Sequence, residues 1–174
     1  MILLRLVLVM VVHGRRPLTC LALATGLMMI CVWPAGWMFR LDVLAGFVAV
    51  PLCVVVHEYG HARTALLLGA RELRAEWRGG SMAVSHEDLE AARNLMVALG
   101  GPAASGAVGG GLIAVGLAYE WQPLALIGAI VAFPASTLIP PGHDGRTCWR
   151  QARHWLADRN RQKSFTGGAL PPLR

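Results

Sequence analysis

The chain has 174 residues and a net charge of +6, and 55% of its residues are hydrophobic while only 15% are charged. A soluble domain carries about 25% charged residues, so this composition and several long apolar runs exclude an ordinary soluble protein and predict a one-domain integral membrane protein. The positive charge requires no nucleic acid as a partner, because basic residues gather on the cytoplasmic side of membrane proteins and the lipid bilayer itself accounts for them.

Residues 1–17 form an N-terminal segment that differs from the rest of the chain. Residues 2–12 are apolar apart from Arg5, but eleven residues are too few to cross a bilayer. Their content of Val, Ile and Leu suits either a strand or a segment that skims the membrane surface. The polar stretch from His13 to Pro17 then ends the run.

Residues 18–145 are expected to form the transmembrane core. The apolar runs in this part of the chain are long enough for about four transmembrane helices. We expect these helices at residues 18–39, 43–68, 85–119 and 123–140. The expected fold class is therefore an all-α polytopic membrane protein.

The segment between the second and third spans has the pattern of a β-hairpin instead. In residues 72–78, charged side chains alternate with Leu73, Ala75 and Trp77, which is the period of a half-buried strand. Gly79-Gly80 is typical of a hairpin turn, and a return strand follows it. A small sheet is thus predicted beside the helices. After it, the spacing Ser85-x-x-Asp88 predicts a capping box that opens the third helix.

The distribution of charge predicts the topology. With the N-terminus placed inside, 15 of the 16 Lys and Arg residues are cytoplasmic and only Arg40 is outside. We therefore expect a multi-pass protein of the cell membrane, in a bacterial plasma membrane, with both termini in the cytoplasm. The tail, residues 146–174, is strongly basic. It is either an amphipathic helix on anionic lipid or a frayed end, and the helix would gather these apolar residues on one face: Trp149, Ala152, Trp155 and Leu156.

The second predicted span contains the motif His57-Glu58-x-x-His61 within an apolar run. Histidines four residues apart lie on one face of a helix, and two neutral imidazoles so placed can bind one Zn²⁺. Glu58 lies beside them and can take a proton from a water molecule, which is the arrangement of metalloproteases. An ionisable group at bilayer depth is costly, so these residues are a functional site by default.

These residues resemble the site-2 protease family of intramembrane zinc metalloproteases. The resemblance rests on the H-E-x-x-H motif, on the break at Gly101-Pro102 and on Asp144-Gly145 near the end of the core. It implies that His57, His61 and Asp144 bind Zn²⁺ and that Glu58 is the general base. It also implies hydrolysis of a peptide bond in or near a transmembrane segment of a membrane-bound protein, such as a single-span regulator, and a small sheet that receives the unwound substrate.

The sequence departs from this family at three positions. Family members usually have Asn where this chain has Ser105 and Ser136, and they usually have a second glycine where Arg146 stands. By the resemblance, the two serines support the substrate or the oxyanion, with Gly79 and Gly80 of the hairpin beside them. A serine hydroxyl reaches less far than an amide. An alternative is therefore an inactive or weak relative that binds and shelters membrane protein partners.

Other ligands for the metal are possible on the sequence alone. His143 adjoins Asp144 and could replace it, whereas His13, His86 and His154 lie in polar segments where solvation is the simpler interpretation. A different class of membrane metalloprotease would use a Glu as its third ligand. Glu120 is the only such residue near the end of a span, and it is on the opposite side of the membrane from the histidines.

Overall fold

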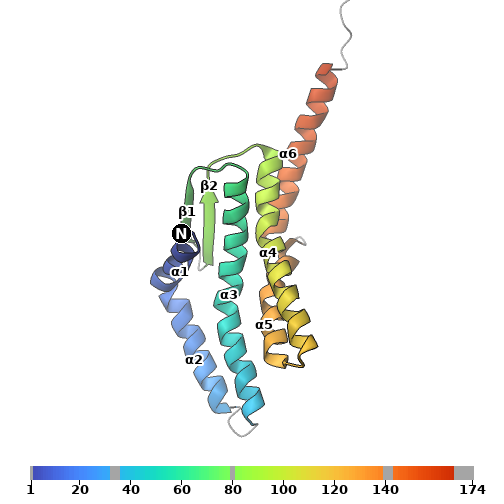
Figure 1. Cartoon of the computed structure of the whole chain (residues 1–174). Helices are drawn as coiled ribbons and strands as arrows, with labels where there is room; N and C mark the ends of the chain where they lie inside the picture. The colour runs from blue at the N-terminus through green and yellow to red at the C-terminus, as the bar shows by residue number, and fades with distance from the viewer. Residues whose placement is uncertain (1, 32–35, 79–80, 139–142, 167–174) are drawn as a thin grey trace, which may run out of the picture.

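The computed structural model describes residues 2–31, 36–78, 81–138 and 143–166. Helices dominate it, and one two-stranded antiparallel sheet lies against them (Figure 1). In chain order the elements are α1 (Ile2–His13), α2 (Arg15–Cys31), α3 (Trp37–Leu67), β1 (Leu73–Arg78), β2 (Ser81–His86), α4 (Ala91–Ala118), α5 (Gln122–Ala132), the 3-10 helix η2 (Phe133–Leu138) and α6 (His143–Thr166).

Two helices in the described part of the chain are long and apolar enough to cross a membrane. They are residues 40–67 of α3 and the whole of α4, and α1 with α2 passes as a third span only if the two are taken together across a bend of 75°. The structure thus supports a helical membrane protein with two or three spans, and the prediction of four transmembrane helices is not confirmed.

The fourth predicted span is short. Helix α5 has 11 residues, which correspond to about 16 Å, and η2 continues it only to Leu138. The six residues of η2 add about 12 Å at a rise of about 2.0 Å per residue, so α5 and η2 together cover about 28 Å. This length is close to the hydrocarbon core of a bilayer, which is about 30 Å thick, but the segment counts only as a shorter apolar helix and not as one of the two long candidate spans. Helix α6 then runs beside the first half of α4 and projects beyond the end of the bundle (Figure 1).

Residues 2–13 form the helix α1, so the strand that was one of the two predictions for this segment is wrong. A helix satisfies its own backbone hydrogen bonds, whereas an added strand needs a partner edge. Leu6 and Met10, four residues apart, are buried on one face of α1. They form a core cluster with Val55 of α3 and Met82 of β2, which holds the sheet between α1 and α3.

The predicted β-hairpin is confirmed. β1 pairs antiparallel with β2 in a register that places Ala75 opposite Val84 and Trp77 opposite Met82. The alternation also holds, because Ala75 and Trp77 pack on the core cluster while Arg74 is exposed. The turn residues Gly79 and Gly80 lie outside the described residues.

The predicted capping box is wrong. Ser85 belongs to β2, opposite Arg74, and its hydroxyl donates to the Arg74 carbonyl (3.3 Å). Helix α4 begins at Ala91 with Glu90 as the N-cap residue, and no side chain caps it. Strand pairing therefore holds Ser85 in the sheet and delays the start of the helix.

Helices α3 and α4 pack closely at the level of the H-E-x-x-H motif. A Cβ atom added to Gly60 would overlap the carbonyl oxygen of Gly100, and one added to Gly100 would overlap the Thr64 hydroxyl. Glycines at both positions therefore let the two backbones touch, as small residues do between membrane helices.

Candidate active site

His57 and His61 lie one turn apart on α3, and their imidazoles face each other. The two Nε2 atoms are 3.1 Å apart, and the ring centroids are 4.7 Å apart in an edge-to-face arrangement. Both residues belong to the second half of α3, next to the sheet (Figure 1).

Helix α4 fixes the other edge of each imidazole. The Nδ1 of His61 is 2.7 Å from the carbonyl oxygen of Val97. Because a carbonyl can only accept, Nδ1 donates its proton there and Nε2 of His61 carries a lone pair. The Nδ1 of His57 is 3.5 Å from the hydroxyl oxygen of Ser105. A Cβ atom on Gly101, which lies between these two α4 positions in the sequence, would overlap the His61 ring.

This arrangement fits a tetrahedral metal ion. Zn–N bonds of about 2.0–2.1 Å at a tetrahedral angle place two ligand nitrogens roughly 3.3 Å apart, close to the 3.1 Å between the Nε2 atoms of His57 and His61. A metal-bound histidine normally donates its other ring N–H to a fixed acceptor, as His61 does. Among the side chains that the structure describes, no group of three or more His, Cys, Asp and Glu is placed to hold a metal ion. His57 and His61 are therefore two candidate donors.

The side chain of Asp144, the predicted third ligand, lies outside the described residues, and so does that of His143. The backbone of both residues opens α6. Thr147 and Gln151, on the next turns of α6, line the same cleft as the two histidines. The start of α6 is thus brought near the histidines, but helical spacing alone does not choose between Asp144 and His143.

Glu58 is held by the hairpin. Its Oε2 accepts a hydrogen bond from the backbone N–H of Val84 in β2 (2.9 Å). The carboxylate therefore faces the sheet while the neighbouring histidines face α4. The contact is made by the backbone N–H of Val84, so no side-chain pattern in the sequence predicts it.

These groups line a cleft of about 740 Å³ between α3, β2, α4, η2 and α6. The polar side chains at its wall are His57, Glu58, His61, Ser85, His86, Asp88, Asn94, Thr137, Thr147 and Gln151. The cleft is large enough for an extended peptide segment, since ligand sites are typically 300–1,000 Å³. His86, which the sequence placed in a polar segment, lies at this wall too, with its Nδ1 2.6 Å from the carbonyl oxygen of Glu87.

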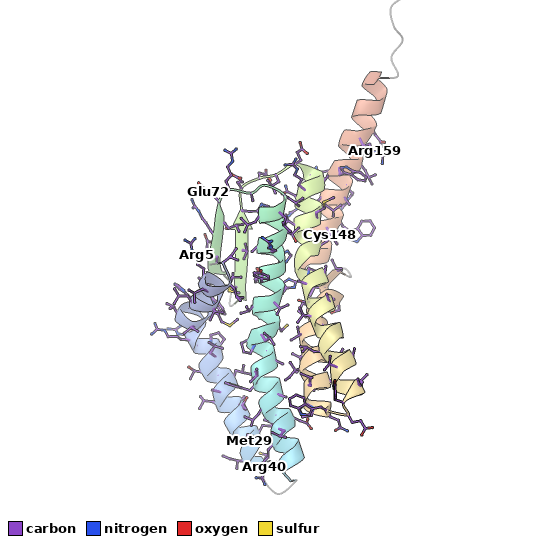
Figure 2. All side chains as sticks on the ribbon, viewed as in Figure 1. Arg5, Met29, Arg40, Glu72, Cys148 and Arg159 are labelled. Atoms are coloured by element: carbon purple, nitrogen blue, oxygen red, sulfur yellow. The ribbon has the colours of Figure 1, made fainter. Side chains whose placement is uncertain are left out.

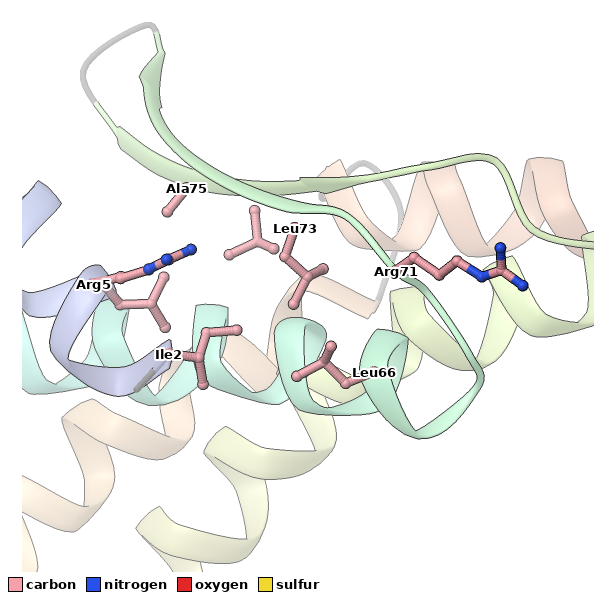
Figure 3. Close-up of a pocket in the computed structure, with 8 residues that line it drawn as sticks. Ile2, Arg5, Leu66, Arg71, Leu73 and Ala75 are labelled. Carbon is pink, nitrogen blue, oxygen red and sulfur yellow. The ribbon is translucent and has the colours of Figure 1, made fainter.

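A second hollow, of about 310 Å³, lies between α1, the end of α3 and the hairpin (Figure 3). Its wall is mostly apolar, and its charged residues are Arg5 and Arg71. Among the described residues that line it, none carries a carboxylate or an imidazole. The hollow therefore lacks the groups for metal binding or proton transfer, and the cleft at His57 is the candidate active site.

The two serines predicted to support the substrate are not at the cleft wall. Ser105 is fully buried beside His57. Ser136 is exposed in η2, and its hydroxyl donates to the carbonyl of Phe133 (2.7 Å). Gly79 and Gly80, the other two residues of that prediction, fall outside the described residues.

The comparison with known families places the chain in one class. The Peptidase M50B-like family model matches residues 48–140, slightly more than half of the chain, and the matched segment includes the H-E-x-x-H motif, the hairpin and α4. The protein therefore belongs to the M50B-like peptidase family, of the site-2 protease type, as its sequence motifs indicated. The match ends before Asp144. No curated protein and no solved structure matches the chain.

Proposed function

We propose that the protein is an intramembrane zinc endopeptidase that hydrolyses a peptide bond in or near a transmembrane segment of another membrane protein. The observation that carries this proposal is the pair of Nε2 atoms, 3.1 Å apart, with the Glu58 carboxylate in the same cleft. Membership of a peptidase family supports the same reaction class. The expected substrate is a membrane-embedded protein such as a single-span regulator.

His57, His61 and Asp144 are the proposed zinc ligands. When bound, Zn²⁺ lowers the pKa of a water molecule toward about 7 and polarises the scissile carbonyl. The neutral imidazoles bind through Nε2, because His61 already commits its Nδ1 proton to Val97. The carboxylate of Asp144 adds a negative charge, which offsets part of the cation's charge at bilayer depth.

Glu58 is the proposed general base. Its carboxylate takes one proton from the attacking water and passes it to the leaving amine, so hydrolysis consumes one water and leaves the enzyme unchanged. The hydrogen bond from the backbone N–H of Val84 holds one carboxylate oxygen, Oε2. The hairpin thereby orients the base.

Metal removal tests the proposed reaction class. The protein, reconstituted in liposomes with candidate single-span proteins, should release fragments whose ends are found by mass spectrometry. Treatment with 1,10-phenanthroline should stop the release, because a strong chelator removes a metal ion that only two or three protein ligands hold. Added Zn²⁺ should restore the release. Cleavage that persists in full after complete zinc removal would contradict a zinc mechanism.

The proposed topology places both termini in the cytoplasm of a multi-pass protein in a bacterial plasma membrane. In the structure, Arg40 lies at one end of α3, and Glu72 and Arg159 lie toward the opposite end of the molecule (Figure 2). Single cysteines in a cysteine-free chain should react with an impermeant reagent from outside near Arg40 and Glu120. Cysteines near Arg78 and Lys163 should react only from inside, and the reverse pattern would contradict the topology.

A second candidate function is a relative that binds membrane proteins without cutting them. One observation favours it: the hydroxyls of Ser105 and Ser136 are directed at His57 and at Phe133, so neither belongs to the cleft wall. If neither hydroxyl can donate to a substrate in the cleft, the site stabilises the transition state of hydrolysis less well. The Glu58 variant described in the Discussion separates the two candidates.

A further inference from the structure

Ser105 is a buried polar residue whose environment points to a role. None of its surface is exposed, and its Oγ lies 3.5 Å from the Nδ1 of His57, on the side of the ring away from the Nε2 that faces His61. A buried hydroxyl that makes no hydrogen bond lowers the stability of the fold by about 1–3 kcal/mol. The contact with His57 therefore accounts for a serine at this buried position.

The contact between His57 and Ser105 resembles the contact between His61 and Val97, since each joins an Nδ1 atom on α3 to an oxygen atom on α4. Helices α3 and α4 run in opposite directions, so the later histidine of the motif meets the earlier residue of α4: His61 meets Val97, and His57 meets Ser105. In the first pair the acceptor is a backbone carbonyl. In the second pair the partner of the imidazole is a side-chain hydroxyl, so a single substitution can remove it.

We propose that Ser105 is a positioning residue for His57, and that it does not contact the substrate. Its hydroxyl oxygen accepts the Nδ1 proton, which leaves the Nε2 lone pair directed at the metal and fixes the rotation of the ring. The separation of 3.5 Å is long for such a bond, and bonds of this kind shorten when the site is loaded. This inference rests on the proposed function, because it assumes that His57 binds zinc.

Zinc affinity tests the inference without any substrate. Ser105→Ala should bind Zn²⁺ about 10- to 100-fold more weakly than wild type in competition with a chromogenic chelator, which is the usual cost of removing the partner of a metal-binding histidine. The visible absorption bands of the Co²⁺-loaded variant should also shift, since the orientation of His57 is no longer fixed.

The matched control is Thr19→Ala. It also removes a helix hydroxyl, one that donates to the Arg15 carbonyl (2.8 Å) on α2, and Thr19 does not line the cleft. Its zinc affinity and Co²⁺ spectrum should equal those of wild type. Ser105→Asn, which brings back an oxygen acceptor, should recover the zinc affinity that Ser105→Ala loses.

Three outcomes would overturn the inference. Equal zinc affinity and an equal Co²⁺ spectrum in wild type and Ser105→Ala would show that the hydroxyl does not position His57. A loss that Ser105→Asn leaves unrepaired would assign the effect to packing. Wild type that binds no zinc at all would overturn the proposed function and this inference together, and that result is distinct from the other two.

Discussion

Glu58→Gln is expected to abolish proteolysis and to leave the fold and zinc binding intact. The amide oxygen of Gln can still accept the hydrogen bond from Val84, so the side chain should keep its place. It cannot take a proton from the water, and loss of general acid–base catalysis lowers a rate about 10²- to 10⁴-fold. The measurement is fragment release from a co-reconstituted single-span protein, with zinc content determined on the same sample.

Glu72→Gln is the matched control for this variant. Glu72 is exposed and pairs with Arg74 at 3.4 Å outside the cleft, so the same chemical change there should leave the cleavage rate unaltered. Uncut substrate should also stay bound to Glu58→Gln and co-purify with it. If wild type and Glu58→Gln bind the same membrane partners and neither releases a fragment, the protein is the sheltering relative.

Asp144→Ala is expected to lose most of the bound zinc. Wild type purified in mild detergent should hold close to one zinc per chain, whereas His57 and His61 alone leave the ion with two protein donors. Structural and catalytic zinc sites use three or four protein ligands, so a two-donor site binds weakly. The measurement is metal content by mass spectrometry after dialysis against a mild chelator.

His143→Ala is the control for that experiment, because the two residues are adjacent at the start of α6. It should keep its zinc if Asp144 is the ligand. Full zinc in Asp144→Ala together with loss in His143→Ala would assign the third ligand to His143.

The sequence predicted the parts of the structure that short-range chemistry determines. The H-E-x-x-H motif lies on a helix as expected, and α3 places His57 and His61 with their Nε2 atoms 3.1 Å apart. The alternation around Trp77 correctly predicted a hairpin, since cross-strand pairs and a half-buried face both leave a period of two. The family match over residues 48–140 confirms the resemblance seen in the motifs.

The predictions that failed depended on contacts between distant segments. A short apolar run such as residues 2–12 fits a strand or a helix by composition, and its packing through Leu6 and Met10 on the hairpin decides for the helix. Ser85 fits a helix cap by spacing, and its pairing with Arg74 decides for the sheet. Neither partner can be identified from the local pattern.

The contacts of His61 with Val97 and of Glu58 with Val84 could not be predicted from the sequence, for a different reason. The carbonyl of Val97 and the N–H of Val84 belong to the backbone, and every residue except proline offers both groups. A valine at either position therefore carries no chemical signal. The tertiary fold selects which backbone groups meet His61 and Glu58.

The close contact between α3 and α4 depends on three positions at which the residue has no side chain. Gly60, Gly100 and Gly101 each leave out a side chain where a single carbon would strike the opposite backbone, a threonine hydroxyl or the imidazole of His61. A methyl group at any of these positions would separate the two helices and draw Val97 and Ser105 away from the rings they hold. The geometry that the imidazoles offer to a metal therefore depends partly on three residues that have no side chain, because their small volume lets the two helices approach.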